Sequence, residues 1–177
     1  MKKLSDKAIA LVMYVFDRLE VQWRKMEEIW FSLVEKIMYL MQSRYVWEYG
    51  IELIKDKFIV SPFWPELKNW NYVIYELWRT LKDIKEAIQV AEWKKWLRKY
   101  EITKLFNEQE IEHIKRLMFY FWWFQWSEIR LFTTNMTEVN KLNKKLEKWT
   151  AKNNVISIKS MEKYNKNILS SNWLIKK

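Results

Sequence analysis

The chain has 177 residues, a net charge of +10 and no cysteine. Without cysteine it forms neither a disulfide framework nor a thiolate metal site. One glycine and two prolines leave almost no turn chemistry for hairpins or Gly-rich phosphate loops, whereas half of the residues are hydrophobic and nearly a third are charged. This balance is typical of amphipathic helices and predicts an all-α protein.

The first predicted element is one long helix from about residue 6 to about residue 58. Ser5 is a candidate N-cap for it. With Ile9 as position a of a heptad, the a and d positions are apolar as far as residue 58, except at Arg44. Gly50 is the expected place for a bend in this helix.

The second predicted element is a helix from about residue 66 to about residue 104. Pro62 and Pro65 end the first helix, and Pro65 suits the first turn of the next one. The heptad then resumes, so the second helix is expected to lie antiparallel to the first. The two helices would form a long coiled-coil-like hairpin and give the protein an elongated helical bundle.

The third predicted element, from about residue 108 to about residue 132, begins after Asn107, a candidate N-cap. It contains the stretch LMFYFWWFQW, which is too short and too closely flanked by charges to cross a membrane. A helix that is apolar on all sides is instead surrounded by protein. Met118 and Phe121 are therefore expected to face a core. The candidate subunit contacts are Phe119, Trp122, Trp123 and Trp126.

A fourth helix is expected around Val139 and Leu142, followed by a short β-prone segment, VISI, and a final helix after Ser160. The chain is then one structural domain with a basic C-terminal extension. Its segments are the long heptad helix (1–60), the second hairpin helix (61–106), the aromatic-rich helix (107–138) and the basic segment (139–177).

The basic segment carries most of the net charge, with ten lysines, two glutamates and no arginine. Lysine is a point charge without the planar fork of arginine, so this pattern favours neutralisation of a nucleic-acid backbone over base reading. Two other interpretations stay open, a solvated helix face with a solubilising tail, and contact with an anionic membrane. The candidate nucleic-acid-binding residues are Lys141, Lys144, Lys145, Lys148, Lys152, Lys159, Lys163 and Lys166.

Catalytic and metal-binding patterns are weak in this sequence. His113 is the single histidine, and its Glu-x-x-His spacing from Glu110 lacks the second copy that a di-iron bundle needs. We expect His113 to lie on a solvated helix face. Paired carboxylates such as Glu48 and Glu52 are expected on exposed faces as well. No metal, no cofactor and no enzymatic activity are therefore expected.

These observations predict a non-enzymatic structural protein that binds nucleic-acid backbone within a large assembly. A viral coat or nucleocapsid subunit and a protein of a ribosome-type particle both fit, as a homo-oligomer or with other subunits. The alternative is a peripheral subunit of a membrane complex that touches the membrane without spanning it. Asp6 and Lys7 interrupt the apolar N-terminal run, so a signal peptide is not expected, and the expected location is a virion or an intracellular compartment, including a mitochondrial type.

Overall fold

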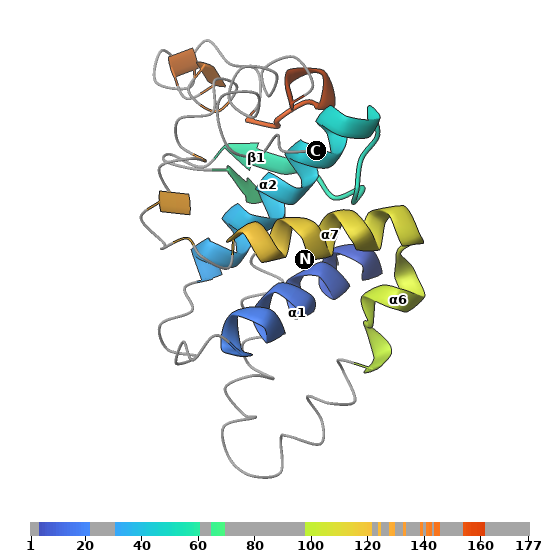
Figure 1. The fold of residues 1–177 in the computed structure, drawn as a ribbon. Helices are drawn as coiled ribbons and strands as arrows, with labels where there is room; N and C mark the ends of the chain where they lie inside the picture. The colour runs from blue at the N-terminus through green and yellow to red at the C-terminus, as the bar shows by residue number, and fades with distance from the viewer. Residues whose placement is uncertain are drawn as a thin grey trace.

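In the computed structural model, residues 4–21, 31–60, 65–69, 98–121, 124, 128–129, 133, 139, 141–142, 144–145 and 154–161 are described. This part of the chain is mainly helical, as predicted, but it also contains one small sheet, which the predicted all-α class did not include (Figure 1). The elements, labelled as in Figure 1, are α1 (Asp6–Val21), α2 (Phe31–Tyr49), β1 (Phe58–Val60), β2 (Pro65–Leu67), α6 (Ile102–Leu105) and α7 (Glu108–Phe121).

Helix α2 is the centre of the fold. Helices α1 and α7 and strand β2 pack against it, and every side chain from Leu33 to Val46 is buried. Figure 1 shows α7 crossing α2, with α1 below them in this view. Because α1 and α2 pack against each other, they are two helices, and the prediction of a single helix from residue 6 to residue 58 is wrong. Described heptad positions such as Ile9, Val12 and Leu40 are core positions, and the chain buries them by packing one helix on another, whereas the heptad position Ile51 is exposed.

The N-terminus of α1 is capped as predicted. The Ser5 hydroxyl accepts a hydrogen bond from the Ala8 N–H at 3.2 Å, which satisfies one of the free amides of the first turn. Ser5 also bonds the Asp56 carboxylate, with its N–H at 3.1 Å and with its hydroxyl. The cap of α1 is therefore attached to the segment that follows α2.

Helix α2 ends at Tyr49, one residue before Gly50, where the sequence predicted a bend in a longer helix. Gly50 has a φ of 71°, in the left-handed region that favours glycine, and its N–H donates to the Val46 carbonyl at 2.8 Å. The chain then folds back along the helix. The Gln42 amide holds it there, accepting from the Ile54 N–H at 3.0 Å and donating to the Ile54 carbonyl at 3.1 Å.

The small sheet pairs β1 with β2 in antiparallel register. The other edge of β1 pairs with the predicted β-prone segment, because Val155 forms a bridge with Ile59. The Val60 N–H donates to the Asn154 carbonyl at 2.8 Å. Since Ile156 is also buried, the described residues 154–161 pack on the body of the protein and are not part of an extended tail.

The predicted second helix is wrong at its start, because Pro65 begins strand β2 and not a helical turn. Proline is tolerated at the start of a strand, so either structure suits it. Residues 70–97 of the predicted helix lie outside the described residues, and its predicted end at about residue 104 is wrong, because Glu101 is extended and a separate short helix, α6, follows it. The long antiparallel hairpin is consequently not seen in the described part of the chain.

The start of α7 follows the prediction closely. The Glu110 N–H donates to the Asn107 side-chain oxygen at 2.9 Å, and the Asn107 N–H donates back to the Glu110 carboxylate at 2.9 Å. Lys7 of α1 also binds the Glu110 carboxylate, at 2.7 Å. At the other end, Phe124 is not helical, so the predicted continuous helix to residue 132 is wrong.

Candidate functional site

The lysines predicted to bind nucleic acid are partly described. Lys141, Lys144 and Lys145 are exposed at helical positions, and we refer to these three residues as the lysine face. Val139 is buried and Leu142 is half-buried against the core, so the expected fourth helix turns its apolar positions inward there. Lys159 is also exposed. The remaining candidates lie outside the described residues: Lys148, Lys152, Lys163 and Lys166.

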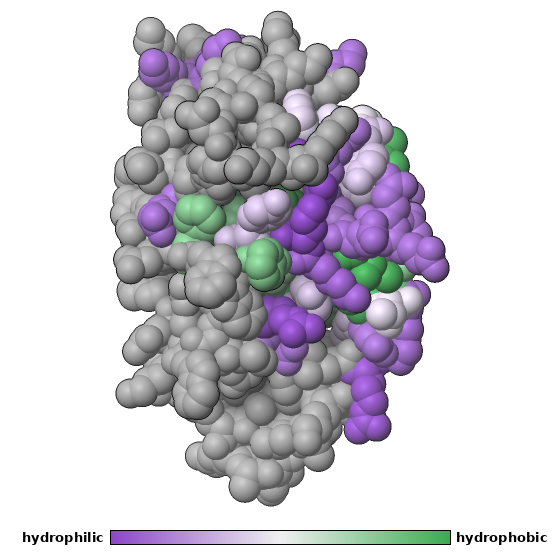
Figure 2. Space-filling view, viewed as in Figure 1, coloured by the Kyte–Doolittle hydropathy of each residue, from purple (hydrophilic) through white to green (hydrophobic). Residues whose placement is uncertain are grey.

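The aromatic stretch divides as the helical spacing predicts, as far as it is described. Met118 and Phe121 are buried, whereas Phe119 is 66% exposed. Figure 2 shows hydrophilic side chains over much of α7 and hydrophobic atoms towards its C-terminal end, beside the atoms drawn in grey. The other candidate subunit contacts lie outside the described residues: Trp122, Trp123 and Trp126.

A polar network joins α2 to α7, and we call it the α2–α7 network. It consists of Arg44, Glu48, His113 and Arg116. The Glu48 carboxylate receives hydrogen bonds from both arginines and lies 3.2 Å from His113 Nδ1. His113 Nε2 lies 2.9 Å from the Met41 carbonyl oxygen. The imidazole thus has an oxygen acceptor at each nitrogen and links the two helices.

Two predictions about charged residues are wrong at this network. His113 is 1% exposed, so it does not lie on a solvated helix face. The side chain of Glu48 is 12% exposed and belongs to the interior, although it was expected on the surface. No local signal marks either residue, because Glu48 and His113 are far apart in the sequence and meet only when α7 packs on α2.

The network keeps Glu48 ionised. Burial raises the pKa of the Glu48 carboxyl, but the hydrogen bonds from His113 and Arg44, the charge of Arg44 and the hydrogen bond from Arg116 outweigh burial and lower the pKa to about 2. A buried carboxylate is stable only with such partners. Arg44, which interrupts the heptad, also stacks its guanidinium on the Trp47 ring, with 4.2 Å to the ring centroid.

The pKa of Glu35, which lies near the other end of α2, is shifted in the opposite direction from that of Glu48. Burial, followed by the charge of Glu66, raises the pKa of the Glu35 carboxyl to about 9. Lys36 and the backbone of Leu67 oppose this shift without reversing it. One carboxyl oxygen of Glu35 is buried without a hydrogen-bond partner. Glu35 is consequently protonated at neutral pH, because burial disfavours the charged carboxylate more than Lys36 and Leu67 favour it.

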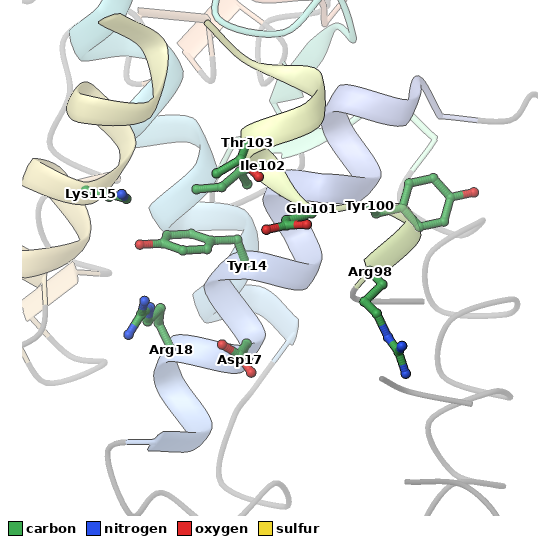
Figure 3. A pocket seen from close by; sticks show the side chains of 9 residues that line it. All are labelled: Tyr14, Asp17, Arg18, Arg98, Tyr100, Glu101, Ile102, Thr103 and Lys115. Atoms are coloured by element: carbon green, nitrogen blue, oxygen red, sulfur yellow. The ribbon is translucent and has the colours of Figure 1, made fainter. Parts of the chain in front are cut away.

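A hollow of about 430 Å³ opens between α1, α6 and α7, and we call it the α1–α6–α7 hollow (Figure 3). Tyr14 and Arg18 reach it from α1, and Lys115 reaches it from α7. Asp17 and Glu101 also line it. No motif in the sequence marks these residues. Tyr14 and Arg18 are four positions apart in α1, and this helical spacing is the signal that could have placed the two on one face.

The described residues contain no group of three or more histidine, cysteine, aspartate or glutamate side chains placed to hold a metal ion. None of the described helices combines the length and the apolar character that crossing a membrane requires. The chain matches no known family model, and comparisons with curated proteins and with solved structures find no significant match.

Proposed function

We propose that the protein is a non-enzymatic structural protein that binds the backbone of nucleic acid through its lysine face. One observation carries this proposal. Lys141, Lys144 and Lys145 are exposed at helical positions, while Val139 and Leu142 of the same segment turn towards the core. Their ammonium groups can therefore reach a partner without disturbing the packing beneath them.

The chemistry of the segment favours phosphate groups. Lysine ammonium groups neutralise phosphates as point charges and release condensed counterions, which gives affinity with little dependence on base sequence. Lys159 is exposed beside the sheet and adds another cation from the same basic segment. The absence of arginine between Val139 and Lys177 agrees with backbone binding, because base reading commonly uses the arginine fork.

The large assembly in this proposal is a viral coat or nucleocapsid, or a ribosome-type particle, in a virion or inside a cell. Exposed Phe119 supports contacts with further subunits, which Trp122, Trp123 and Trp126 would extend. For the architecture of the subunit, we retain the expectation that residues 70–97 form a helix that packs antiparallel to a helix of the body. Such a helix would supply the second arm of an elongated bundle.

The proposal is tested with a variant in which Lys141, Lys144, Lys145 and Lys148 are changed to Gln. Glutamine keeps most of the helix propensity of lysine, so the helix should persist. We expect affinity for two oligonucleotides of unrelated sequence to fall about tenfold or more, and equally for both. Fluorescence anisotropy of labelled oligonucleotides measures this loss.

A control with half of this charge loss changes Lys55 and Lys68, which are exposed on other parts of the body, to Gln. If the two-lysine control loses half or more of the binding free energy that the four-lysine variant loses, binding depends on net charge alone and the proposed site is wrong. Vesicles with and without anionic lipid test the alternative of a peripheral membrane subunit. Wild-type protein that binds anionic vesicles and neither oligonucleotide would replace the proposal with that alternative.

A further inference from the structure

The α1–α6–α7 hollow has two cations, Arg18 and Lys115, and the Tyr14 hydroxyl on the side towards α7, while a third cation, Arg98, lines it on the side of Tyr100. In Figure 3 the Tyr14 hydroxyl lies between the Arg18 guanidinium and the Lys115 ammonium group, on the side of the hollow towards α7. The Arg18 guanidinium carbon lies 5.4 Å from the centroid of the Tyr14 ring, so the ring holds the arginine in place. These donors come from two helices that the fold brings together.

The two cations are available to a ligand. Arg18 and Lys115 are exposed, and within the described part of the chain neither of them forms an ion pair. This contrasts with Arg44 and Arg116, which both bind the Glu48 carboxylate. An arginine fork, a lysine point charge and a hydroxyl donor together suit the tetrahedral oxygens of a phosphate group.

The acidic residues of the hollow limit what can bind there. Figure 3 places the Glu101 carboxylate on the α6 side and Asp17 on α1, apart from the Lys115 ammonium group. Lys104 lies 3.3 Å from the Glu101 carboxylate and offsets part of its charge. The two carboxylates would repel an extended polyanion that filled the hollow, so a single phosphate group on the α7 side fits best.

We propose that the α1–α6–α7 hollow binds one phosphate group, through Arg18, Lys115 and the Tyr14 hydroxyl. Its volume of about 430 Å³ lies in the range of small-molecule sites, so the group can belong to a nucleotide. The phosphate can come from a free nucleotide or from the end of a nucleic-acid strand. The site is independent of the proposed function, because none of its three residues belongs to the lysine face.

The test is calorimetric titration of the full chain with inorganic phosphate, adenosine monophosphate and adenosine. We expect the monophosphate to bind and adenosine not to bind. Changing Arg18 and Lys115 together to Gln should weaken monophosphate binding about tenfold or more, since both charge-assisted contacts are lost. Tyr14→Phe keeps the ring under Arg18 and removes one hydroxyl, so it should weaken binding by roughly threefold.

The control for this site is again the variant with Lys55 and Lys68 changed to Gln, which loses the same charge elsewhere and should bind the monophosphate as the wild type does. Equal weakening in the control and in the Arg18 and Lys115 variant would overturn the proposal. Failure of wild-type protein to bind either phosphate compound at millimolar concentration would overturn it as well. Circular dichroism checks that each variant is folded, which the exposure of both side chains favours.

Oligonucleotides with and without a 5′-phosphate identify the source of the phosphate group. If the 5′-phosphate raises affinity and the Arg18 and Lys115 variant loses that gain, the site takes the end of a strand. If the variant loses binding of the monophosphate alone, the site takes a free nucleotide. Either result supports the phosphate site, and both are distinct from the loss of backbone binding expected for the lysine-face variant.

Discussion

The α2–α7 network and the lysine face hold charged side chains in opposite environments. In the network, Glu48 is surrounded by the cations Arg44 and Arg116 and by buried His113. The three residues of the lysine face are exposed. Buried charges need partners and so specify how helices pack, whereas exposed lysines contribute little to the fold and can bind a polyanion. Substitutions in the network should therefore change stability, whereas substitutions on the lysine face should change the affinity for nucleic acid.

The largest effect on stability is expected from Glu48→Ala. It leaves two arginines and a buried imidazole without their shared acceptor. Removing one partner of a fully buried ion pair costs about 3 to 5 kcal/mol, and because Glu48 is only partly buried and Arg116 is exposed, we expect a loss at the lower end of this range, about 3 kcal/mol. Urea unfolding followed by circular dichroism measures the loss. The control is Glu52→Ala. Among the described residues Glu52 pairs with the more exposed Lys57, at 3.0 Å, so this variant should cost less than about 1 kcal/mol. Equal losses in the two variants would contradict the role of the network.

The next largest effect is the pH dependence of stability that the buried Glu35 carboxyl should cause. Because its folded pKa is raised from 4.5 to about 9, the stabilisation by the protonated carboxyl is complete below pH 4.5 and is lost as the pH rises towards 9. Stability should therefore fall by about 1.4 kcal/mol per pH unit, or about 3 kcal/mol between pH 5 and pH 7. Glu35→Gln, which cannot ionise, should remove this fall, and an unchanged pH profile of the variant would refute the assignment.

Glu48 should cause a smaller pH dependence of stability with the opposite sign. Its folded pKa is lowered from 4.5 to about 2, so its stabilisation is present above pH 4.5 and is lost as the pH falls towards 2. Allowing for partial contact with solvent, the loss should be roughly 2 kcal/mol. Unfolding measured between pH 5 and pH 2 should show this loss in wild-type protein and not in Glu48→Gln.

Phe119→Ser should change stability least among these substitutions. The side chain is 66% exposed, so its removal should alter the free energy of unfolding by less than about 0.5 kcal/mol. If Phe119 contacts another subunit, the variant should shift towards monomer in sedimentation velocity experiments. Wild-type protein that is strictly monomeric would rule out the subunit contact.

The sequence predicts local features of this fold better than its long-range contacts. The caps at Ser5 and Asn107 are confirmed because each depends on residues three positions apart. The heptad identifies core positions such as Ile9 and Leu40, but it also includes Ile51, which is 57% exposed. Periodicity measures the apolar face of a helix and not its length, so it could not distinguish one long helix from two that pack together.

The contacts that the sequence did not reveal join distant segments. The side-chain amide of Gln42 bonds the backbone N–H and carbonyl of Ile54, as a neighbouring strand would. Nothing in the local sequence distinguishes this buried glutamine from an exposed one. His113 meets Glu48 only through the packing of α7 on α2. The lysine face could be predicted without knowledge of any long-range contact. Charged and apolar residues at regular helical spacing indicate which side of the segment is exposed.

The most direct test of the account measures two quantities on the variant with Lys141, Lys144, Lys145 and Lys148 changed to Gln. The first is the slope of log affinity for nucleic acid against log salt concentration, and the second is the free energy of unfolding. The account predicts that the slope flattens by up to roughly four units, at about 0.9 per lost contact on duplex or about 0.7 on a single strand. Stability should stay within about 0.5 kcal/mol of wild type. An unchanged slope in a folded variant would contradict the role assigned to the lysine face.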